Sequence, residues 1–300
     1  MRDVHVLFAV VQHGSMAKAG AHLGMSQSAV SQAVAELERA LDVRLLDRTP
    51  RGTALTPYGT ALLRRGRAAF DELRSGVNDI EFLKTSEVGE VRIACTESVA
   101  AGILPAIVER FSRRYPKVRL TVYQTTTHLL GFAALEDRNA DLVLTLLPKP
   151  FEKDLTEHLQ AEVLLRDRIC LAVSKHGEWA RRRKIRLADL NGVPLISPAS
   201  DTPGVAAILD AFKADGLTAT INITTFSIHL RSLLSMRGRF IAVLPASVLR
   251  FNPDVYALKE LQLDLAMPEP PILIVTLKDR TLAVPVERFI DCARDIAKGT

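Results

Sequence analysis

The sequence predicts an α/β protein with a helical N-terminal head, and three observations lead to that prediction. The first 50 or so residues carry closely spaced helix signals, and one unbroken helical pattern then runs from Thr56 to about Lys84. After Gly89, short apolar runs alternate with helical segments up to the C-terminus. Alternating strands and helices are typical of a sheet covered by helices. A chain of 300 residues is long enough for about two domains.

The head begins with three short predicted helices. Gly14 ends the first, Ser15 can cap the second, and Ser26 can cap the third. The loop before Ser26 is only about two or three residues, the length of a helix-turn-helix turn. We expect the helices to bury Val4, Leu7, Phe8 and Val11; Met16, Ala19 and Leu23; and Val30, Val34, Leu37 and Leu41, respectively.

The outer face of the third helix is rich in small neutral donors and acceptors. It carries Gln27, Ser28, Ser31, Gln32 and Ala35. Gln and Ser can pair with base edges in a major groove, which admits a helix. The backbone N–H groups at a helix N-terminus also favour phosphate. The alternative is a plain helical hairpin with a soluble Ser/Gln surface.

Arginines follow the third helix and favour a nucleic-acid partner over that alternative. Between Arg39 and Arg67 there are seven Arg, no Lys and two acidic residues, Asp42 and Asp47. The stretch "VRLLDRTPRGTALTP" predicts a small hairpin with its turn at Pro50-Arg51-Gly52. Such a hairpin beside three helices is the geometry of a winged helix-turn-helix. Ser15, Lys18, Arg48 and Arg51 would then contact the DNA backbone.

A long helix is predicted to follow the head. Thr56-Pro57 is a strong start signal, because a capping hydroxyl precedes a proline at the first helical position. A helix of this length spans on the order of 40 Å. Two apolar series repeat every seven residues, which favours pairing with a second copy of the chain. The alternative is packing along the chain's own second domain. The two series are Leu63, Phe70 and Val77, and Gly66, Leu73 and Ile80.

The remaining 210 or so residues predict a parallel sheet region divided into two halves. They are too many for one compact half, and strands alternate with helices throughout. Ligands of such sheets lie beyond the carboxyl ends of the strands. We expect strands at 91–95, 118–124, 141–147, 161–166, 169–173, 195–197, 219–224, 240–244 and 272–277, and helices at 98–114, 127–138, 204–215, 227–236 and 284–297.

Hydroxyl-rich segments follow four of these strands, at Thr96–Ser98, Thr125–His128, Ser197–Thr202 and Thr225–His229. Each segment alone is explained as an ordinary helix cap. Four at equivalent places exceed what capping needs, so they favour a binding cleft.

The sequence argues against catalysis, metal binding and export. It contains no GxGxxG, GxxxxGK, GxSxG or HExxH motif, and its seven histidines have no metal-like spacing. Cys95, Cys170 and Cys292 lie far apart without a CxxC pair, which suits a reducing compartment. The N-terminus shows neither a basic n-region nor a cleavage site. We therefore expect a cytoplasmic protein with no cofactor, no metal and no membrane partner.

The head carries a specific family resemblance. The run "GSMAKAGAHLGMSQSAVSQAVAELERALDVRLLDRTPRGTALTPYG" resembles the DNA-binding head of the LysR-type transcriptional regulators. The later stretches "ILPAIVERFSRRYPKVRL", "DLVLTL" and "IAVLPAS" are similar to that family's effector domain, in the same order. Two positions depart from the pattern: Ser28 where the family usually has Pro, and Gly20 where it usually has Ala. Glycine within a helix costs about 1 kcal/mol relative to alanine, so we expect a less stable head.

The resemblance implies three domains. These are a winged helix-turn-helix at 1–56, a dimerisation linker helix at 57–87 and an effector-binding domain at 88–300. The last is expected to be periplasmic-binding-protein-like, with subdomain I at 88–164 and 268–300 and subdomain II at 165–267. The effector would bind in the cleft between the subdomains.

The resemblance also implies roles for individual residues. Gln27 and Ser31 would meet bases or phosphate, with Ser26, Ser28 and Gln32 beside them. The cleft would be lined by Ser98, Thr127, His128, Ser197, Thr202 and His229. Hydroxyls at helix N-termini suit a small organic anion. Some members of the family sense peroxide with cysteines, but Cys170 lies in an apolar strand, so we expect inert thiols.

The sequence is thus identified as a LysR-type regulator that binds promoter or operator DNA under the control of a small effector. Its expected partners are double-stranded DNA, the effector, further copies of itself in a homodimer or homotetramer, and RNA polymerase. A stand-alone solute-binding protein is opposed by the entire head. A cytoplasmic enzyme is opposed by the missing catalytic motifs.

Overall fold

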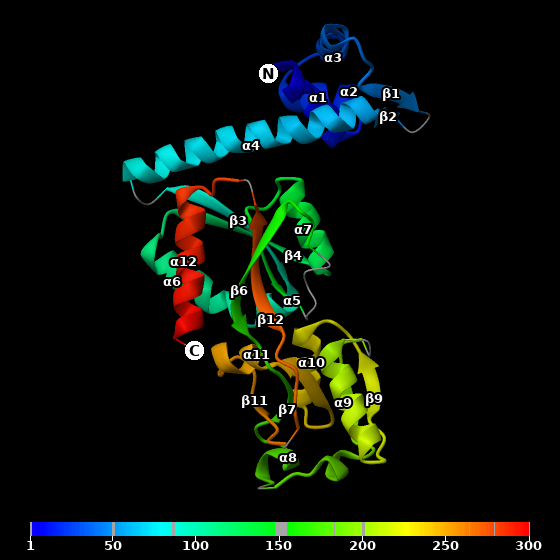
Figure 1. The fold of residues 1–300 in the computed structure, drawn as a ribbon, viewed down its shortest axis with the longest axis vertical. Helices are drawn as coiled ribbons and strands as arrows, with labels where there is room; N and C mark the ends of the chain where they lie inside the picture. The colour runs from blue at the N-terminus through cyan, green and yellow to red at the C-terminus, as the bar shows by residue number, and fades with distance from the viewer. Residues whose placement is uncertain are drawn as a thin grey trace. The chain divides into compact units, whose positions relative to one another are not determined.

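The computed structural model describes residues 2–49, 52–85, 88–147, 155–182, 184–199, 202–263, 265–278 and 280–299. The chain divides into two compact units, Met1–Gly76 and Val77–Thr300 (Figure 1). Each unit has its own hydrophobic core. No helix in the described ranges is long and apolar enough to cross a membrane.

The first unit contains the predicted three helices and hairpin. They are α1 (Arg2–His13), α2 (Met16–Leu23), α3 (Gln27–Leu41), β1 (Leu46–Thr49) and β2 (Gly52–Leu55). Val30 and Val34 are buried as expected. The expectation for Leu41 was wrong: its side chain is 45% exposed. Helix α3 ends there, because Asp42 adopts a left-handed conformation at φ 52° and turns the chain away.

The turn between α2 and α3 corrects the expectation for Gly20. Gly24 closes α2 in the left-handed conformation, and the N–H of Met25 then donates to the Gly20 carbonyl at 2.8 Å. A Cβ at Gly20 would lie 2.6 Å from the carbonyl oxygen of Met25. Alanine would therefore clash in this turn, so its higher helix propensity does not make it the better residue here.

Glu38 joins the end of α3 to the hairpin. Its Oε1 accepts the N–H groups of Leu45 and Leu46 at 2.7 and 3.2 Å. Thr56 continues this junction, since its hydroxyl donates to the Arg44 carbonyl at 2.6 Å. The hairpin is thus fixed at both of its ends.

Helix α4 (Pro57–Thr85) is the predicted long helix, and its heptad series is divided between two environments. In the first half of α4, the Phe70 ring packs edge-on against Phe8 of α1, with ring centroids 5.6 Å apart. Further along, the side chains of Leu73, Val77 and Ile80 are 54%, 55% and 54% exposed. Half of the apolar series is therefore covered by the head, and the other half faces outward.

The second unit contains two five-stranded sheets. The first has the order β4-β3-β5-β12-β6 and the second β11-β7-β10-β8-β9. We call them, with their helices, lobe I and lobe II. The strands are β3 (Gly89–Thr96), β4 (Val118–Thr125), β5 (Leu142–Leu146), β6 (Leu159–Arg166), β7 (Ile169–Ser174), β8 (Pro194–Ser197), β9 (Thr220–Thr224), β10 (Ile241–Pro245), β11 (Leu258–Glu260) and β12 (Pro271–Leu277).

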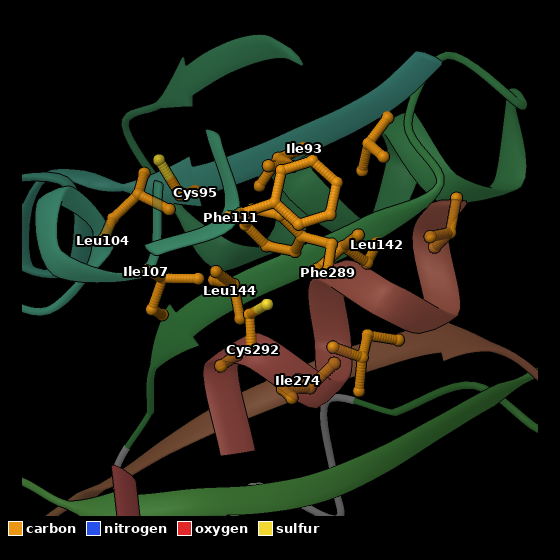
Figure 2. Packing of buried hydrophobic residues seen from close by; sticks show 14 of the residues in the cluster. Ile93, Cys95, Leu104, Ile107, Phe111, Leu142, Leu144, Ile274, Phe289 and Cys292 are labelled. Carbon is orange, nitrogen blue, oxygen red and sulfur yellow. The ribbon is translucent and has the colours of Figure 1, made fainter. Parts of the chain in front are cut away.

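Helices cover the sheets of both lobes. Lobe I carries α5 (Glu97–Ala101), α6 (Leu104–Arg114), α7 (His128–Glu136) and α12 (Val284–Lys298). Lobe II carries α8 (Glu178–Arg181), a 3-10 helix (Leu187–Leu190), α9 (Pro203–Ala214), α10 (Ile228–Met236) and α11 (Ala246–Phe251). Figure 2 shows the core of lobe I, where Phe111 of α6 and Phe289 of α12 meet over Ile93 and Leu144.

Two details of the predicted α/β region were wrong. The sheets are mixed, because β12 runs antiparallel to β5 and β6, and β7 runs antiparallel to β10 and β11. The helix expected over 98–114 is two helices. Gly102 has a non-helical conformation between them, and a Cβ at this position would overlap the side chain of Ser247. Pro105 then lies in the first turn of α6.

The chain passes between the lobes twice. The first passage follows β6, and the second precedes β12. The two passages are hydrogen-bonded to each other, since the N–H of Asp167 donates to the Pro270 carbonyl at 2.9 Å and that of Ile169 to the Pro268 carbonyl at 3.1 Å.

A buried ion cluster fixes the sheet of lobe I. Asp141 accepts from the guanidinium groups of Arg92 and Arg280, each at 2.8 Å, and from the backbone N–H of Arg92 at 2.8 Å. Burial alone would raise the pKa of Asp141, but these hydrogen bonds and charges lower it from 3.8 to about 2. The carboxylate therefore stays charged within the core.

Candidate functional site: a nucleic-acid interface and an effector cleft

The N-terminal half of α3 presents its polar side chains to solvent. Ser26, Gln27, Ser28 and Gln32 are exposed, and Ser31 is half-buried. Ser26 caps the helix by accepting the N–H of Ala29 at 3.1 Å, and its hydroxyl lies 2.9 Å from that of Ser28. Since the helix core face is turned inward through Val30 and Val34, this run forms one outward surface.

Other candidate DNA contacts also form hydrogen bonds within the head. The Gln32 amide donates to Glu36 one turn later at 3.0 Å. Ser15 caps α2 by accepting the N–H of Lys18 at 3.2 Å. Arg48 pairs with Thr53 across the hairpin, but its side chain, and Arg51 as a whole, lie outside the described residues. The predicted backbone contacts of these two arginines therefore stay predictions.

In lobe I, the candidate effector residues follow neighbouring strands. Strands β3 and β4 are paired in parallel, so the segments after their carboxyl ends lie at one edge of the sheet. Ser98 is half-buried on α5, directly after β3. Thr127 is exposed and caps α7, accepting the N–H of Leu130 at 3.3 Å. The ring of His128 packs against that of Phe132 with centroids 5.5 Å apart.

In lobe II, the candidates also follow paired strands, β8 and β9, but their side chains are differently placed. Ser197 is fully buried and donates to the Pro198 carbonyl at 2.9 Å. Thr202 donates to the Ala199 carbonyl at 2.8 Å. His229 is exposed on α10, with Nδ1 3.4 Å from the Tyr256 hydroxyl. Of the three, His229 is exposed, Thr202 is half-buried and Ser197 is buried.

The sequence did not single out the side chains that join the two lobes near the carboxyl end of β3. Glu97 of lobe I accepts the N–H of Ile228 of lobe II at 3.0 Å, and it also accepts a hydrogen bond from Gln124. Asn252 of lobe II donates to the carbonyls of Ala101 and Gly102 at 3.0 and 2.9 Å. Glu97 lies within one of the hydroxyl-rich segments, which is the only local signal for its position.

Two hollows of the surface lie elsewhere. One of about 530 Å³ is lined by residues of α6 and α12, including Arg110 and Arg113. The other, of about 460 Å³, surrounds the chain passages between the lobes, including Asp167 and Arg168. Neither is lined by the six candidate effector residues.

The three cysteines are buried thiols. Burial raises the pKa of Cys170 and of Cys292, and it raises that of Cys95 to about 11, with a smaller contribution from the Glu97 charge. Thiolate is the reactive form of cysteine, so this burial disfavours reaction. No group of His, Cys, Asp and Glu suited to a metal ion occurs among the described residues.

Comparisons with known proteins cover the whole chain. The family model described as "LysR substrate binding domain" matches residues 84–298, and "Bacterial regulatory helix-turn-helix protein, lysR family" matches residues 1–60. The uncharacterized HTH-type transcriptional regulator YfeR of Shigella flexneri is 28% identical over 298 residues, covering 98% of this chain and 93% of the relative.

Solved structures share the fold. Full-length OxyR from Pseudomonas aeruginosa superimposes with a TM-score of 0.66 at 16% identity, covering 99% of this chain and 93% of that one. Full-length CbnR complexed with its target DNA superimposes with a TM-score of 0.55 at 22% identity, covering 99% of both chains. One LysR family model thus matches the head, and a second matches the two lobes that follow it. The chain belongs to the LysR family of bacterial transcriptional regulators, with a DNA-binding helix-turn-helix and an effector-binding domain.

Proposed function

We propose that helix α3 reads base edges in the major groove through Gln27, Ser28, Ser31 and Gln32. The observation that carries this proposal is the exposed polar run on the N-terminal half of α3, opposite its buried valines. Gln can make a bidentate contact to adenine, and Ser can pair with several bases. Ser15, Lys18, Arg48 and Arg51 would hold the phosphate backbone on either side.

A selection from a random DNA pool tests this reading role. The wild-type chain should enrich a motif with two half-sites, because LysR regulators oligomerise. The Gln27→Ala variant should lose the preference at one position of each half-site while keeping the others. Recovery of the same motif by both proteins would contradict the role of Gln27.

We propose that the outward half of the α4 apolar series is the pairing surface. Leu73, Val77 and Ile80 lie three or four residues apart, so they form one stripe along the helix, and all three are more than half exposed. Apolar stripes of this kind are covered by a partner helix in paired helices. The variant Ile80→Asp should lower the mass seen by light scattering, whereas Glu81→Asp should not.

We propose further that the effector is a small organic anion held between the lobes. A hydroxyl caps one helix N-terminus in each lobe: Thr127 caps α7, which follows β4, and Ser227 caps α10, which follows β9. Backbone N–H groups and helix dipoles favour negative charge at such places. Ser98, His128, Thr202 and His229 would complete the site, and Ser197 would support it from beneath, since it is fully buried.

Calorimetry of the full-length chain against a panel of small carboxylic acids, amines and neutral compounds tests this class. We expect binding from the acids alone, and loss of that binding in Thr127→Val. Binding by amines or neutral compounds only would refute it. We propose that the bound compound regulates the protein and is not consumed. An assay for consumption of the compound separates this role from an enzymatic one. Because the proposed target is chromosomal DNA, the protein would act in the cytoplasm.

A further inference from the structure

Glu97 lies where the two lobes meet and reaches from one to the other. It is the first residue of α5 in lobe I, directly after β3. Its Oε1 accepts the N–H of Ile228, the first residue of α10 in lobe II, at 3.0 Å. Its Oε2 accepts a hydrogen bond from the Gln124 amide at the end of β4. Both oxygens of this carboxylate are therefore occupied by the protein itself.

The N-terminus of α10 is a place that favours an anion. The first N–H groups of a helix lack partners within the helix, and the dipole makes this end positive. The Ser227 hydroxyl takes the N–H of Leu230 at 3.2 Å, and Glu97 takes that of Ile228. A carboxylate of the chain therefore lies at the position that a bound anion would take, which we call the anion seat.

A buried cation in the same helix adds to this preference. Arg231 is 4% exposed, and its described hydrogen bonds go to the backbone carbonyls of Val243 and Phe226. Burial lowers the pKa of its guanidinium to about 10, and the charge of Glu97 opposes that shift. The carboxylate of Glu97 therefore also interacts with a cation that has been removed from water.

The other end of α5 is held to lobe II by a different kind of contact. The Asn252 amide donates to the carbonyls of Ala101 and Gly102 at 3.0 and 2.9 Å. This contact joins a neutral amide to neutral carbonyls, so an anion is favoured less there than at the positive end of α10. The contact of Glu97 is made by a carboxylate, so another carboxylate can replace it.

We propose that Glu97 is a built-in occupant of the anion seat at the N-terminus of α10, and that an anionic effector binds by displacing it. Displacement releases the start of α5 from lobe II while Asn252 still holds its end, so binding is coupled to a rotation of α5 between the lobes. An effector shifts such an equilibrium because it binds the displaced state better than the occupied one. The effector class rests on the function proposed above, whereas occupation of the seat by Glu97 is tested separately.

Acetate is the probe, because it reproduces the end of the glutamate side chain. The full-length wild type, Glu97→Ala and Glu97→Gln are melted in rising acetate, with chloride at equal ionic strength as reference. Binding to the folded state alone raises Tm as acetate increases. If Glu97 fills the seat nine-tenths of the time, the wild type binds acetate about tenfold more weakly than Glu97→Ala.

Glu97→Gln separates occupation from charge. It removes the same negative charge as Glu97→Ala but keeps a side chain of nearly the same shape in the seat. We expect acetate to raise the Tm of Glu97→Ala with the logarithm of its concentration once the site is filled, and to raise those of the wild type and Glu97→Gln only at acetate concentrations about tenfold higher. Glu287→Ala, an exposed position on α12, controls for the loss of a carboxylate elsewhere.

Equal acetate responses of Glu97→Ala and Glu97→Gln would overturn the proposal, since charge alone would then explain them. No rise in the Tm of Glu97→Ala above its chloride reference would overturn it as well. If acetate raises the Tm of Glu97→Ala as expected but the effector screen yields only amines or neutral compounds, the proposal that Glu97 occupies the seat stands. The proposal of an anionic effector then fails. The two proposals can therefore fail independently.

Discussion

Two helix N-termini in this regulator have the same capping chemistry and opposite surroundings. Helix α3 is capped by Ser26 and α10 by Ser227, each serine accepting an N–H three residues later. Beyond the cap, α3 exposes Gln27 and Ser28 to solvent, whereas α10 receives the carboxylate of Glu97. A cap motif therefore marks a helix end, whereas segments distant in sequence decide whether this end is available to a partner.

The largest effect should come from the buried ion cluster in the sheet of lobe I. Asp141→Ala leaves the guanidinium of Arg280, 1% exposed, without its carboxylate. Removing one partner of a buried ion pair costs about 3–5 kcal/mol of unfolding free energy. Urea unfolding followed by the fluorescence of Trp179, the single tryptophan, measures this loss. The exposed Asp210→Ala is the control, and an equal loss in both variants would contradict the role of the cluster.

The same carboxylate predicts a dependence of stability on pH. Its pKa is lowered from 3.8 to about 2 in the folded protein, so its stabilisation is present above pH 4 and is lost as the pH falls towards 2. The shift corresponds to about 2 kcal/mol of unfolding free energy. Urea midpoints of the wild type and Asp141→Asn should therefore converge between pH 4 and pH 2. A constant difference over this range would show that Asp141 is not the titrating group.

At the exposed N-terminus of α3, we expect substitutions to weaken DNA binding and to leave folding unchanged. We expect Gln27→Ala to weaken binding to the specific site by about 1–3 kcal/mol and binding to random DNA very little, because the lost contact is to a base edge. Anisotropy titrations with both duplexes measure the two losses. Equal losses would mean that Gln27 contacts the backbone, and thermal melting checks that the variant is folded.

The smallest expected effect is on salt dependence. Arg48→Ala should reduce the slope of log K against log salt by about one unit, since one phosphate contact is lost. Lys84→Ala, in the last turn of α4, is the matched loss of a positive charge away from the head. If both variants kept the wild-type slope, Arg48 would have a structural role in the hairpin.

The head was the more predictable half, because its signals are local. Gly14, Ser15 and Ser26 each mark a boundary that the structure confirms, and the apolar spacing of α3 identified Val30 and Val34 as buried. Local spacing did not predict the exposure of Leu41, which follows from the left-handed turn at Asp42. It also gave no reason for Gly20, whose neighbour Met25 approaches only once the turn has formed.

The lobes were less predictable, because their decisive contacts are distant in sequence. Strand positions follow from apolar runs, but the antiparallel insertion of β12 beside β5 depends on the chain returning to lobe I after about 100 residues in lobe II. Glu97 and Ile228 are 131 positions apart. The hydroxyl-rich segments located this edge of the sheets, but the carboxylate that occupies it was visible only in the fold.

Fluorescence anisotropy of the full-length protein on the DNA upstream of its own reading frame tests the central claim, that the exposed end of α3 reads sequence. The titration is run against scrambled DNA of the same length over a range of salt. We predict a preference of at least about 10³ for the upstream DNA, retained as salt rises. Weak and equal binding to both duplexes, falling steeply with salt, would show phosphate contact alone on this DNA and contradict the claim for this site.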